Sequence, residues 1–244
     1  MKQLLPILLF TFCFSITRDD IYNDSWALVI GIDNYQNVQG LDYAVKDAES
    51  VKKMLIDLFG FDKKNVTILK DQEATKLNII QEFSNITRKA KSTDRVLIFF
   101  AGHGETESLP GGGELGYLMP VDGDKEDLYV SSVSMNELRT ISQRSNAKHI
   151  LCLVDACYGG IAAAGGSRGL TFSSSETPNY IKKITQYKSR QVISAGGRDE
   201  PVIEKPEWGH SAFTKNLLAG LRDWRADTDY DGIITTQELG VFLK

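Results

Sequence analysis

The chain has 244 residues, of which 42% are hydrophobic and 25% are charged, and its formal net charge at pH 7 is -4. This length suits one α/β domain with a sizeable core. The weakly acidic balance and the scattered Lys and Arg residues argue against a nucleic-acid partner, because such partners are bound by a basic stripe or patch.

The first residues of the chain have the form of a secretory signal peptide. Lys2 is followed by an apolar run from Leu4 to Ile16 and then by polar residues. A run of about thirteen apolar residues is too short to span a bilayer, so residues 1–17 are predicted to be a cleaved signal peptide. We therefore expect a protein that is secreted or held in the secretory-pathway lumen, without stable membrane insertion. An uncleaved membrane anchor is the alternative.

Residues 25–244 alternate between apolar strands and amphipathic helices. Short apolar runs predict strands at 26–32, 66–69, 96–100, 150–154 and 191–194. Apolar residues at helical spacing predict helices at 43–59, 75–90, 134–143, 211–221 and 237–243. Residues 105–133 break this pattern and indicate a hairpin with 117–119 as one arm. The alternation predicts an α/β fold with a mostly parallel central sheet between layers of helices.

Two of the predicted strands lead into residues that can perform chemistry. His103 lies three residues past the strand 96–100, and Cys157 follows the strand 150–154. If these strands are neighbours in the sheet, the imidazole faces the thiol across one crevice and can act as its base. The backbone N–H groups of Gly104 and Cys157 are then placed to stabilise an oxyanion. The competing interpretation treats Cys157 as an inert core residue and His103 as an ordinary surface residue.

The residues at these two strand ends resemble a known family. A strand followed by His103-Gly104, and about fifty residues later a strand followed by Asp155-Ala156-Cys157-Tyr158-Gly159-Gly160, is similar to the caspase-like cysteine peptidases. That group holds caspases, metacaspases, paracaspases and their bacterial relatives. The resemblance runs from about residue 26 to the C-terminus. It implies a caspase-like three-layer α/β/α sandwich and a cysteine-type endopeptidase with a His-Cys dyad, acting on proteins or peptides.

The same resemblance divides the domain into two regions. Residues 25–160 correspond to the large-subunit region and residues 181–244 to the small-subunit region, with a Gly- and Ser-rich loop at 161–180 between them. Many members of the group cut themselves at this junction. Arg168, near the centre of the loop, is the hypothesised self-processing site, and an uncut surface loop is the alternative.

Two carboxylates suggest which side chain is recognised before the scissile bond. Caspases that cut after Asp carry Gln at the position of Asp155 and an Arg near the first helix, where this chain has residues 41–43, Leu-Asp-Tyr. Metacaspases, which prefer Arg or Lys, carry Asp at the positions of Asp155 and Asp47, and this chain has both. A carboxylate there repels Asp and pairs with a cation, so the resemblance implies cleavage after Arg or Lys. Ala44 and Ala101 replace small polar residues of some metacaspase pockets.

Residues 227–238 form a second motif, because they match the key positions of an EF-hand calcium loop. The predicted calcium ligands are Asp227, Asp229, Asp231, the backbone of Ile233, and Glu238. EF-hands normally occur in pairs and this chain has one, so a metal-free acidic turn is the alternative. The peptidase chemistry itself is predicted to need no cofactor.

Two other functions stay open at this point. One is a catalytically silent, calcium-responsive binding or regulatory module with the same fold. The other is an Asn-specific, legumain-like peptidase, since the charge of Asp155 argues against Asp but only weakly against Asn. Of the remaining candidates, His210 is expected to make a loop or capping contact, His149 to be half-exposed without a partner, and Cys152 to be a buried structural thiol.

Overall fold

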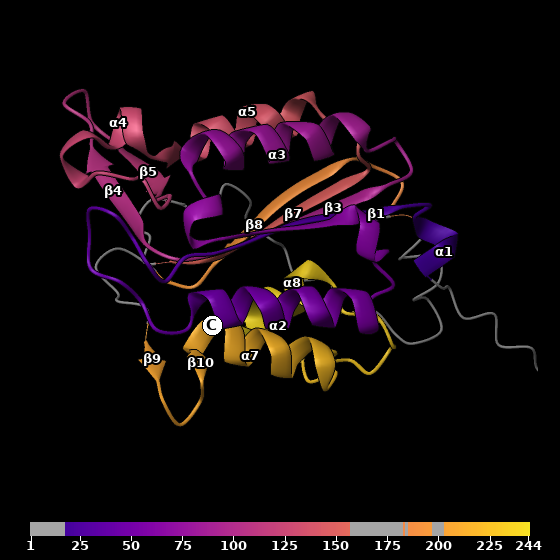
Figure 1. The fold of residues 1–244 in the computed structure, drawn as a ribbon. Coiled ribbons are helices and arrows are strands. Elements are labelled where there is room, and N and C mark those ends of the chain that lie inside the picture. Colours follow the sequence, from indigo (N-terminus) through magenta and orange to yellow (C-terminus); the bar gives the residue numbers. More distant parts are fainter. Residues whose placement is uncertain (1–17, 157–182, 184, 197–202) are drawn as a thin grey trace, which may run out of the picture.

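The computed structural model describes residues 18–156, 183, 185–196 and 203–244. Its centre is a five-stranded sheet in the order β2-β1-β3-β7-β8, and all its neighbouring strands run parallel (Figure 1). The strand bounds are β1 Ser25–Gly31, β2 Val66–Lys70, β3 Arg95–Ala101, β7 His149–Asp155 and β8 Ser189–Ser194. The predicted α/β fold with a mostly parallel sheet is confirmed, and every predicted strand is present close to its predicted bounds.

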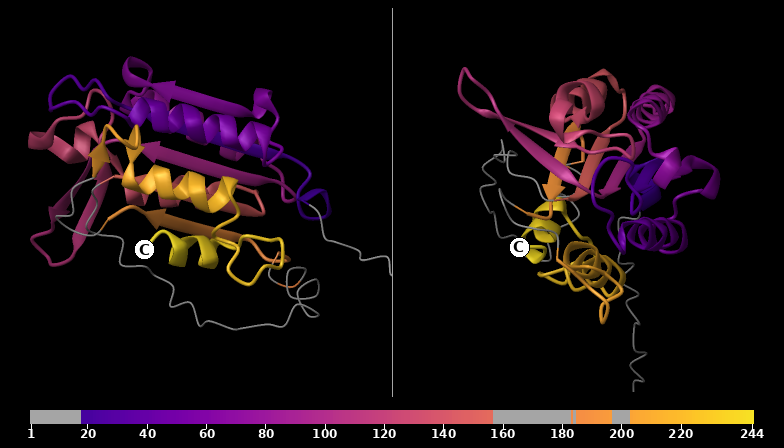
Figure 2. Two further views of the ribbon diagram at one scale, coloured as in Figure 1. Left: turned by 90° about the horizontal axis from the view of Figure 1, so that it is seen from below. Right: turned by 60° about the vertical axis from the view of Figure 1, so that its left-hand side comes forward.

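Helices cover both faces of this sheet and make the predicted three-layer sandwich. Figures 1 and 2 show α3 and α5 on one face and α2, α7 and α8 on the other. The bounds are α2 Ala44–Asp57, α3 Lys76–Lys89, α5 Met135–Arg144, α7 Ala212–Arg222 and α8 Thr236–Phe242. Shorter helical pieces are α1 Arg18–Ile21, α4 Leu128–Ser131 and the 3-10 turns Lys63–Asn65, Asp71–Glu73 and Lys125–Asp127.

Two small antiparallel sheets lie beyond the carboxyl ends of the parallel strands, the end toward which the arrowheads point in the left view of Figure 2. The first joins β4 (Gly104–Ser108), β5 (Glu114–Leu118) and β6 (Val133–Ser134) and contains the predicted hairpin. The second pairs β9 (Glu204–Lys205) with β10 (His210–Ser211). Strands of two residues carry no readable alternation, so the sequence did not predict this second hairpin.

The helix ends follow from local side-chain chemistry. Ser134 and Glu137 form the predicted capping box at the start of α5, and the Ser211 hydroxyl accepts the N–H of Thr214 at the start of α7. Gly60 has φ of +64°, a left-handed conformation that glycine adopts at little cost after a helix end. These short-range signals are why the helix bounds could be predicted closely.

The core has two halves because side chains alternate across the sheet. Phe100 of β3 and Val154 of β7 pack with Phe83 of α3 on one side. On the other side, the next residues inward, Phe99 and Leu153, pack against α2 and α7. This double burial holds the strand ends in fixed register, and those ends carry the candidate site.

Several predictions fall on residues that the structure does not describe. The predicted signal peptide at 1–17, the predicted nucleophile Cys157 and the hypothesised processing site Arg168 all lie outside the described residues. Within the part of the chain that is described, no helix is both long enough and apolar enough to cross a membrane.

Candidate active site

His103 follows the end of β3, the strand next to the one that leads to Cys157. β3 and β7 pair in register up to Ala101 and Asp155, so the two strands are neighbours, as the dyad requires. The N–H of Gly102 donates to the carbonyl of Asp155 at 3.1 Å, which ties the two strand ends together. Ala101 and Asp155 are directly opposed, and His103 and Cys157 each follow two positions later in the sequence.

The imidazole of His103 is oriented by a backbone carbonyl. Its Nε2 lies 2.8 Å from the carbonyl oxygen of Gln39, in the loop between β1 and α2. A carbonyl can only accept, so in the neutral imidazole Nε2 carries the proton and Nδ1 carries the lone pair. A base needs that lone pair. The sequence offered no signal for Gln39, because its contribution comes from the backbone.

Tyr35 holds His103 from the other side. The N–H of His103 donates to the Tyr35 hydroxyl at 2.7 Å, and the two rings lie 4.8 Å apart between centroids. Burial raises the pKa of Tyr35, so its phenol stays neutral. A Cβ at Gly102 would lie only 2.4 Å from the Tyr35 hydroxyl, so glycine is required there. The carboxylate of Asp71 accepts the N–H groups of Asp33 and Asn34 and so fixes the loop that carries Tyr35.

Gly104, the predicted oxyanion donor, is the first residue of β4 and pairs with Leu118. The N–H of Met119 donates to the carbonyl of His103, which makes Gly104 and Leu118 a non-hydrogen-bonded pair of the antiparallel ladder. The Gly104 N–H therefore points away from β5. It is not used by that ladder, and its role as an oxyanion donor stays a prediction.

Asp155 and Asp47, the predicted specificity carboxylates, are brought together at this end of the sheet. Asp155 ends β7 and is 2% exposed, and Asp47, in the first turn of α2, is 0% exposed. One residue bridges them, because Ser211 donates its N–H to Asp47 at 3.1 Å and its hydroxyl to Asp155. Thr214 donates to the same Asp155 oxygen, Oδ2, at 2.6 Å. The other oxygen, Oδ1, has no hydrogen-bond partner among the described residues.

Burial dominates the electrostatics of this pair. It raises the pKa of Asp155 to about 7, against the lowering effect of the hydrogen bonds from Ser211 and Thr214, and the charge of Asp47 raises it further. Burial likewise raises the pKa of Asp47 to about 7. Two buried carboxylates that share Ser211 as a donor favour binding a proton or another cation.

Residues 24–240 match the family model described as the caspase domain of peptidase family C14. The chain belongs to this family. Its members are cysteine peptidases, and the match spans both halves of the sandwich described above. The strand pair that carries His103 and leads to Cys157 is thus part of a caspase domain.

Curated relatives of this caspase domain are metacaspases. The chain is 30% identical to metacaspase-1 of Eremothecium gossypii over 148 residues, which cover 56% of the chain and 32% of the relative. It is 26% identical to metacaspase-7 of Arabidopsis thaliana over 174 residues, covering 66% and 41%. With metacaspase-1B of Neurospora crassa it shares 23% identity over 211 residues, covering 78% and 49%. The chain thus spans a third to a half of the length of these relatives.

A solved structure with a similar fold comes from Geobacter sulfurreducens. That crystal structure aligns with a TM-score of 0.60 and 18% sequence identity, and the alignment covers 83% of each chain. At this identity the likeness bears on the fold alone.

Replacing Tyr35 with Phe in this caspase domain is expected to lower peptide hydrolysis about tenfold, because His103, the predicted base, loses the contact that fixes its backbone. The free energy of unfolding should fall by about 1 to 3 kcal/mol, since the His103 N–H loses its acceptor. Urea unfolding and peptide hydrolysis measure the two effects. Tyr117→Phe is the control, because its hydroxyl donates to Glu107 and not to the site. Equal losses of activity in both variants would contradict the role of Tyr35.

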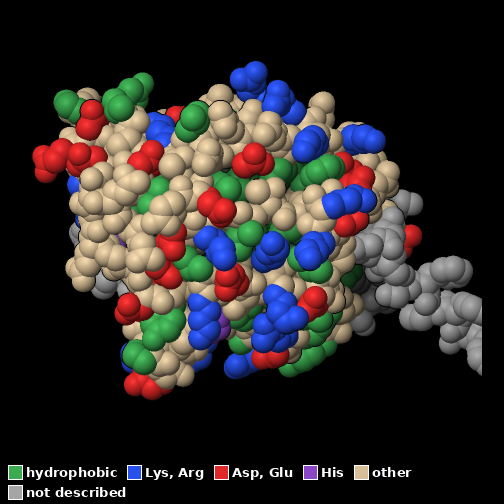
Figure 3. Space-filling view, in the orientation of Figure 1, with side chains coloured by type: hydrophobic (Ala, Val, Ile, Leu, Met, Phe, Trp, Pro, Cys, Tyr) green, Lys and Arg blue, Asp and Glu red, His purple; other side chains and the backbone are tan. Residues whose placement is uncertain are grey.

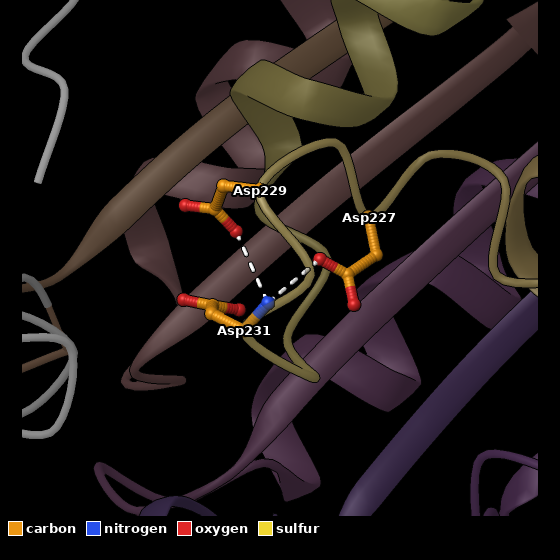
Figure 4. Close-up of side chains that lie close together, drawn as sticks. All are labelled: Asp227, Asp229 and Asp231. Carbon is orange, nitrogen blue, oxygen red and sulfur yellow. Dashed lines mark hydrogen bonds between the residues drawn. The ribbon is translucent and has the colours of Figure 1, made fainter. Parts of the chain in front are cut away.

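The predicted calcium loop brings its three aspartates together but not its last ligand. One carboxylate oxygen each of Asp227, Asp229 and Asp231 lies within 4.8 Å of the others (Figure 4). Asp227 accepts the N–H groups of Asp231 and Gly232, which folds the loop around its carboxylate. Glu238 is outside this group of three.

Glu238 is instead held by the helix that follows the loop. Its Oε2 accepts from Thr235 in the capping box of α8, and its Oε1 accepts the N–H of Thr228 at 3.1 Å. Ile233, predicted to contribute its carbonyl, donates its N–H to Asp231. To reach a cation at the three aspartates, Glu238 must leave these contacts, so calcium binding stays a prediction.

Calcium is expected to raise the thermal midpoint of unfolding by about 3 °C at ten times its dissociation constant, which corresponds to about 1.4 kcal/mol. Asp227→Asn should abolish this shift because it removes the most buried of the three carboxylates. Thermal scans with calcium, magnesium and chelator measure it, with Asp223→Asn, just outside the loop, as the control. An unchanged midpoint at every calcium concentration would favour the metal-free acidic turn.

The two remaining histidines and Cys152, which were not assigned to the active site, also have defined contacts or burial. His210 contacts the side chain of Asp47, in the first turn of α2. His149, expected to have no partner, contacts both the Tyr22 hydroxyl and the carbonyl of Tyr187, so that expectation was wrong. Cys152 is buried, as predicted, and burial raises its thiol pKa to about 12, which keeps it unreactive.

Proposed function

We propose that this chain is a cysteine-type endopeptidase that cleaves peptide bonds after Arg or Lys. The observation that carries the proposal is Asp155, a buried carboxylate at the strand end two residues before Cys157, with one oxygen that has no donor among the described residues. A buried carboxylate oxygen is strongly stabilised by a cation that donates hydrogen bonds to it. Arg and Lys are the substrate side chains that supply such a cation.

In the proposed reaction, Cys157 attacks the carbonyl carbon of the scissile bond and His103 moves the proton. Since Nε2 of His103 is engaged by the Gln39 carbonyl, Nδ1 accepts the thiol proton and later gives it to the leaving amine. The same carbonyl stabilises the imidazolium that exists between these steps. The N–H groups of Gly104 and Cys157 hold the oxyanion, and water then hydrolyses the thioester. No cofactor takes part in these steps.

Surface charge supports a basic substrate. On the face drawn in Figure 3, acidic side chains gather toward the end of the molecule where the carboxyl ends of the strands lie. Glu107 of β4 and Glu204 of β9 belong to this end, whereas Glu105 of β4 is paired with Lys125. An excess of one charge raises the local concentration of oppositely charged ligands and speeds their association.

Burial adds a condition to binding. Because Asp155 and Asp47 are almost fully buried, a substrate side chain reaches them only when the groups that cover them move apart. Binding of the correct substrate is thus coupled to a local rearrangement, which costs affinity but adds selectivity for a side chain long enough to reach Asp155.

The test is hydrolysis of fluorogenic peptides that differ only in the residue before the scissile bond, which is Arg, Lys, Asp or Asn. Wild type and Cys157→Ala are compared, with calcium and with chelator. The proposal requires cleavage after Arg or Lys that disappears in the variant. Cleavage after Asn alone would point to the legumain-like alternative. No cleavage under any condition would overturn the proposal and leave the silent binding module.

Self-processing and secretion are further parts of the proposal. The hypothesis that Arg168 is cut by the protein itself agrees with cleavage after Arg, and Arg168→Ala is expected to keep the chain in one piece while Cys157→Ala does the same. Conversion of the Arg168 variant to the same fragments would contradict it. The predicted signal peptide at 1–17 implies that processing takes place in or beyond the secretory pathway.

A further inference from the structure

The start of α7 organises both buried carboxylates of the site. Residues 210, 211 and 214 all contact them: His210 and Ser211 contact Asp47, and Ser211 and Thr214 contact Asp155. The β9–β10 hairpin ends at Ser211, which is also the N-cap of α7. One short segment thus sets the positions of two acidic side chains that come from other elements.

The two carboxylates are occupied unequally. In Asp47, Oδ1 lies 2.5 Å from Nδ1 of His210, and Oδ2 accepts the N–H of Ser211. In Asp155, both hydroxyl donors share Oδ2, and Oδ1 has no partner among the described residues. Only Asp155 therefore has an oxygen available to a ligand. Asp47 already has a donor or a proton-sharing partner on each oxygen.

Charge balance explains why His210 stands beside Asp47. Two buried carboxylates cannot both be neutralised by one monovalent side chain of a substrate. A proton shared between Asp47 and His210 leaves that pair without net charge, whichever partner holds the proton. Asp155 is then the single negative charge that matches one Arg or Lys.

We infer that His210 is a positioning residue for substrate recognition: it holds and neutralises Asp47, so that Asp155 alone meets the basic side chain before the scissile bond. This inference rests on the proposed function, since it names the residue that shapes the same pocket. It also assigns unequal roles to the two carboxylates, with Asp155 contacting the substrate and Asp47 supporting the segment around Ser211.

The surroundings of His210 agree with this role. Burial lowers the pKa of its imidazole, and the positive charges of Lys46 of α2 and Arg222 of α7 lower it further. On the acidic side, Glu204 of β9 and Asp33 of the β1–α2 loop face Asp47 and raise its pKa. These charges all favour the state in which Asp47 and His210 share one proton and carry no net charge.

The experiment compares His210→Ala and His210→Asn with wild type, using the peptide with Arg before the scissile bond. Alanine removes the partner of Asp47, and KM is expected to rise about tenfold while kcat changes less than about twofold. Asparagine places an amide nitrogen where Nδ1 stands, so it can hold Asp47 in position, but it cannot share a proton with Asp47 and is expected to restore only part of the lost affinity. The rate at which iodoacetamide alkylates Cys157 should be the same in all three proteins, because the dyad is untouched.

His149→Ala is the matched control. His149 begins β7, at the opposite end of the strand from Asp155, and also makes two polar contacts. Its loss can lower stability but should leave KM unchanged. An unchanged KM in His210→Ala, or a fall in kcat as large as the rise in KM, would overturn the inference. If wild type itself does not cleave after Arg or Lys, the proposed function fails, and that result is separate from the comparison of variants.

Discussion

Replacing Asp155 with Asn is expected to lower kcat/KM for the peptide with Arg before the scissile bond by about a hundred- to a thousandfold. The variant keeps the shape of the side chain and its acceptor for Ser211 and Thr214, but it removes the negative charge that pairs with the substrate cation. Removing one partner of a buried charge pair costs about 2 to 5 kcal/mol. Steady-state kinetics with the Arg peptide measures the loss.

As a control, each protein is also assayed with a peptide that has an uncharged residue in place of Arg. Its slow hydrolysis should be nearly the same in wild type and in Asp155→Asn, because no charge pair is lost. Alkylation of Cys157 by iodoacetamide should also be unchanged. A variant that still cleaves the Arg peptide at the wild-type rate would show that Asp155 does not contact the substrate.

The same variant is expected to change how stability depends on pH. The usual pKa of Asp is 3.8, and burial raises that of Asp155 to about 7 in the folded protein. Between these values the folded state holds a proton that the unfolded state has released, so the stability from this group is full below about pH 4 and falls as pH rises to about 7. Urea unfolding measures this effect: between pH 5 and pH 8 the free energy of unfolding should fall less in Asp155→Asn than in wild type.

Replacing His103 with Ala is expected to lower kcat by about a thousand- to ten-thousandfold for every peptide, since it removes the group that takes and returns the proton. The loss should be equal for the Arg peptide and the uncharged peptide, unlike the loss in Asp155→Asn. Alkylation of Cys157 near neutral pH should also slow, because the thiolate loses its partner. Kinetics and alkylation rates together distinguish the base from a specificity residue.

His210→Ala serves as the control for this second prediction. It removes the one other histidine at this end of the molecule that the structure describes, and it should leave kcat within about twofold because His210 contacts Asp47 rather than a strand-end base position. If the His103 variant retains kcat and the His210 variant loses it, the assignment of the base is wrong.

The main elements could be predicted because their signals are local. The run of Val96 to Phe100 and the run of Ile150 to Val154 are apolar on both faces, and the structure buries them in the middle of the sheet. The capping box of Ser134 and Glu137 predicted the start of α5 from four residues of sequence. The hairpin with longer arms, β4–β5, was also predicted. The two-residue strands β9 and β10 were not, because they are too short to show an alternation of apolar and polar residues.

The sequence by itself determined the α/β class and the strand ends that carry His103 and lead to Cys157, because hydrophobic period and motif are properties of neighbouring residues. Asp47 and Asp155 were indicated only by the resemblance to metacaspases. Only the tertiary structure decided which partners these groups have. His210 lies 163 positions from Asp47, and Gln39 acts on His103 through a backbone carbonyl 64 positions away. Such contacts depend on how whole elements pack, and no local pattern encodes them.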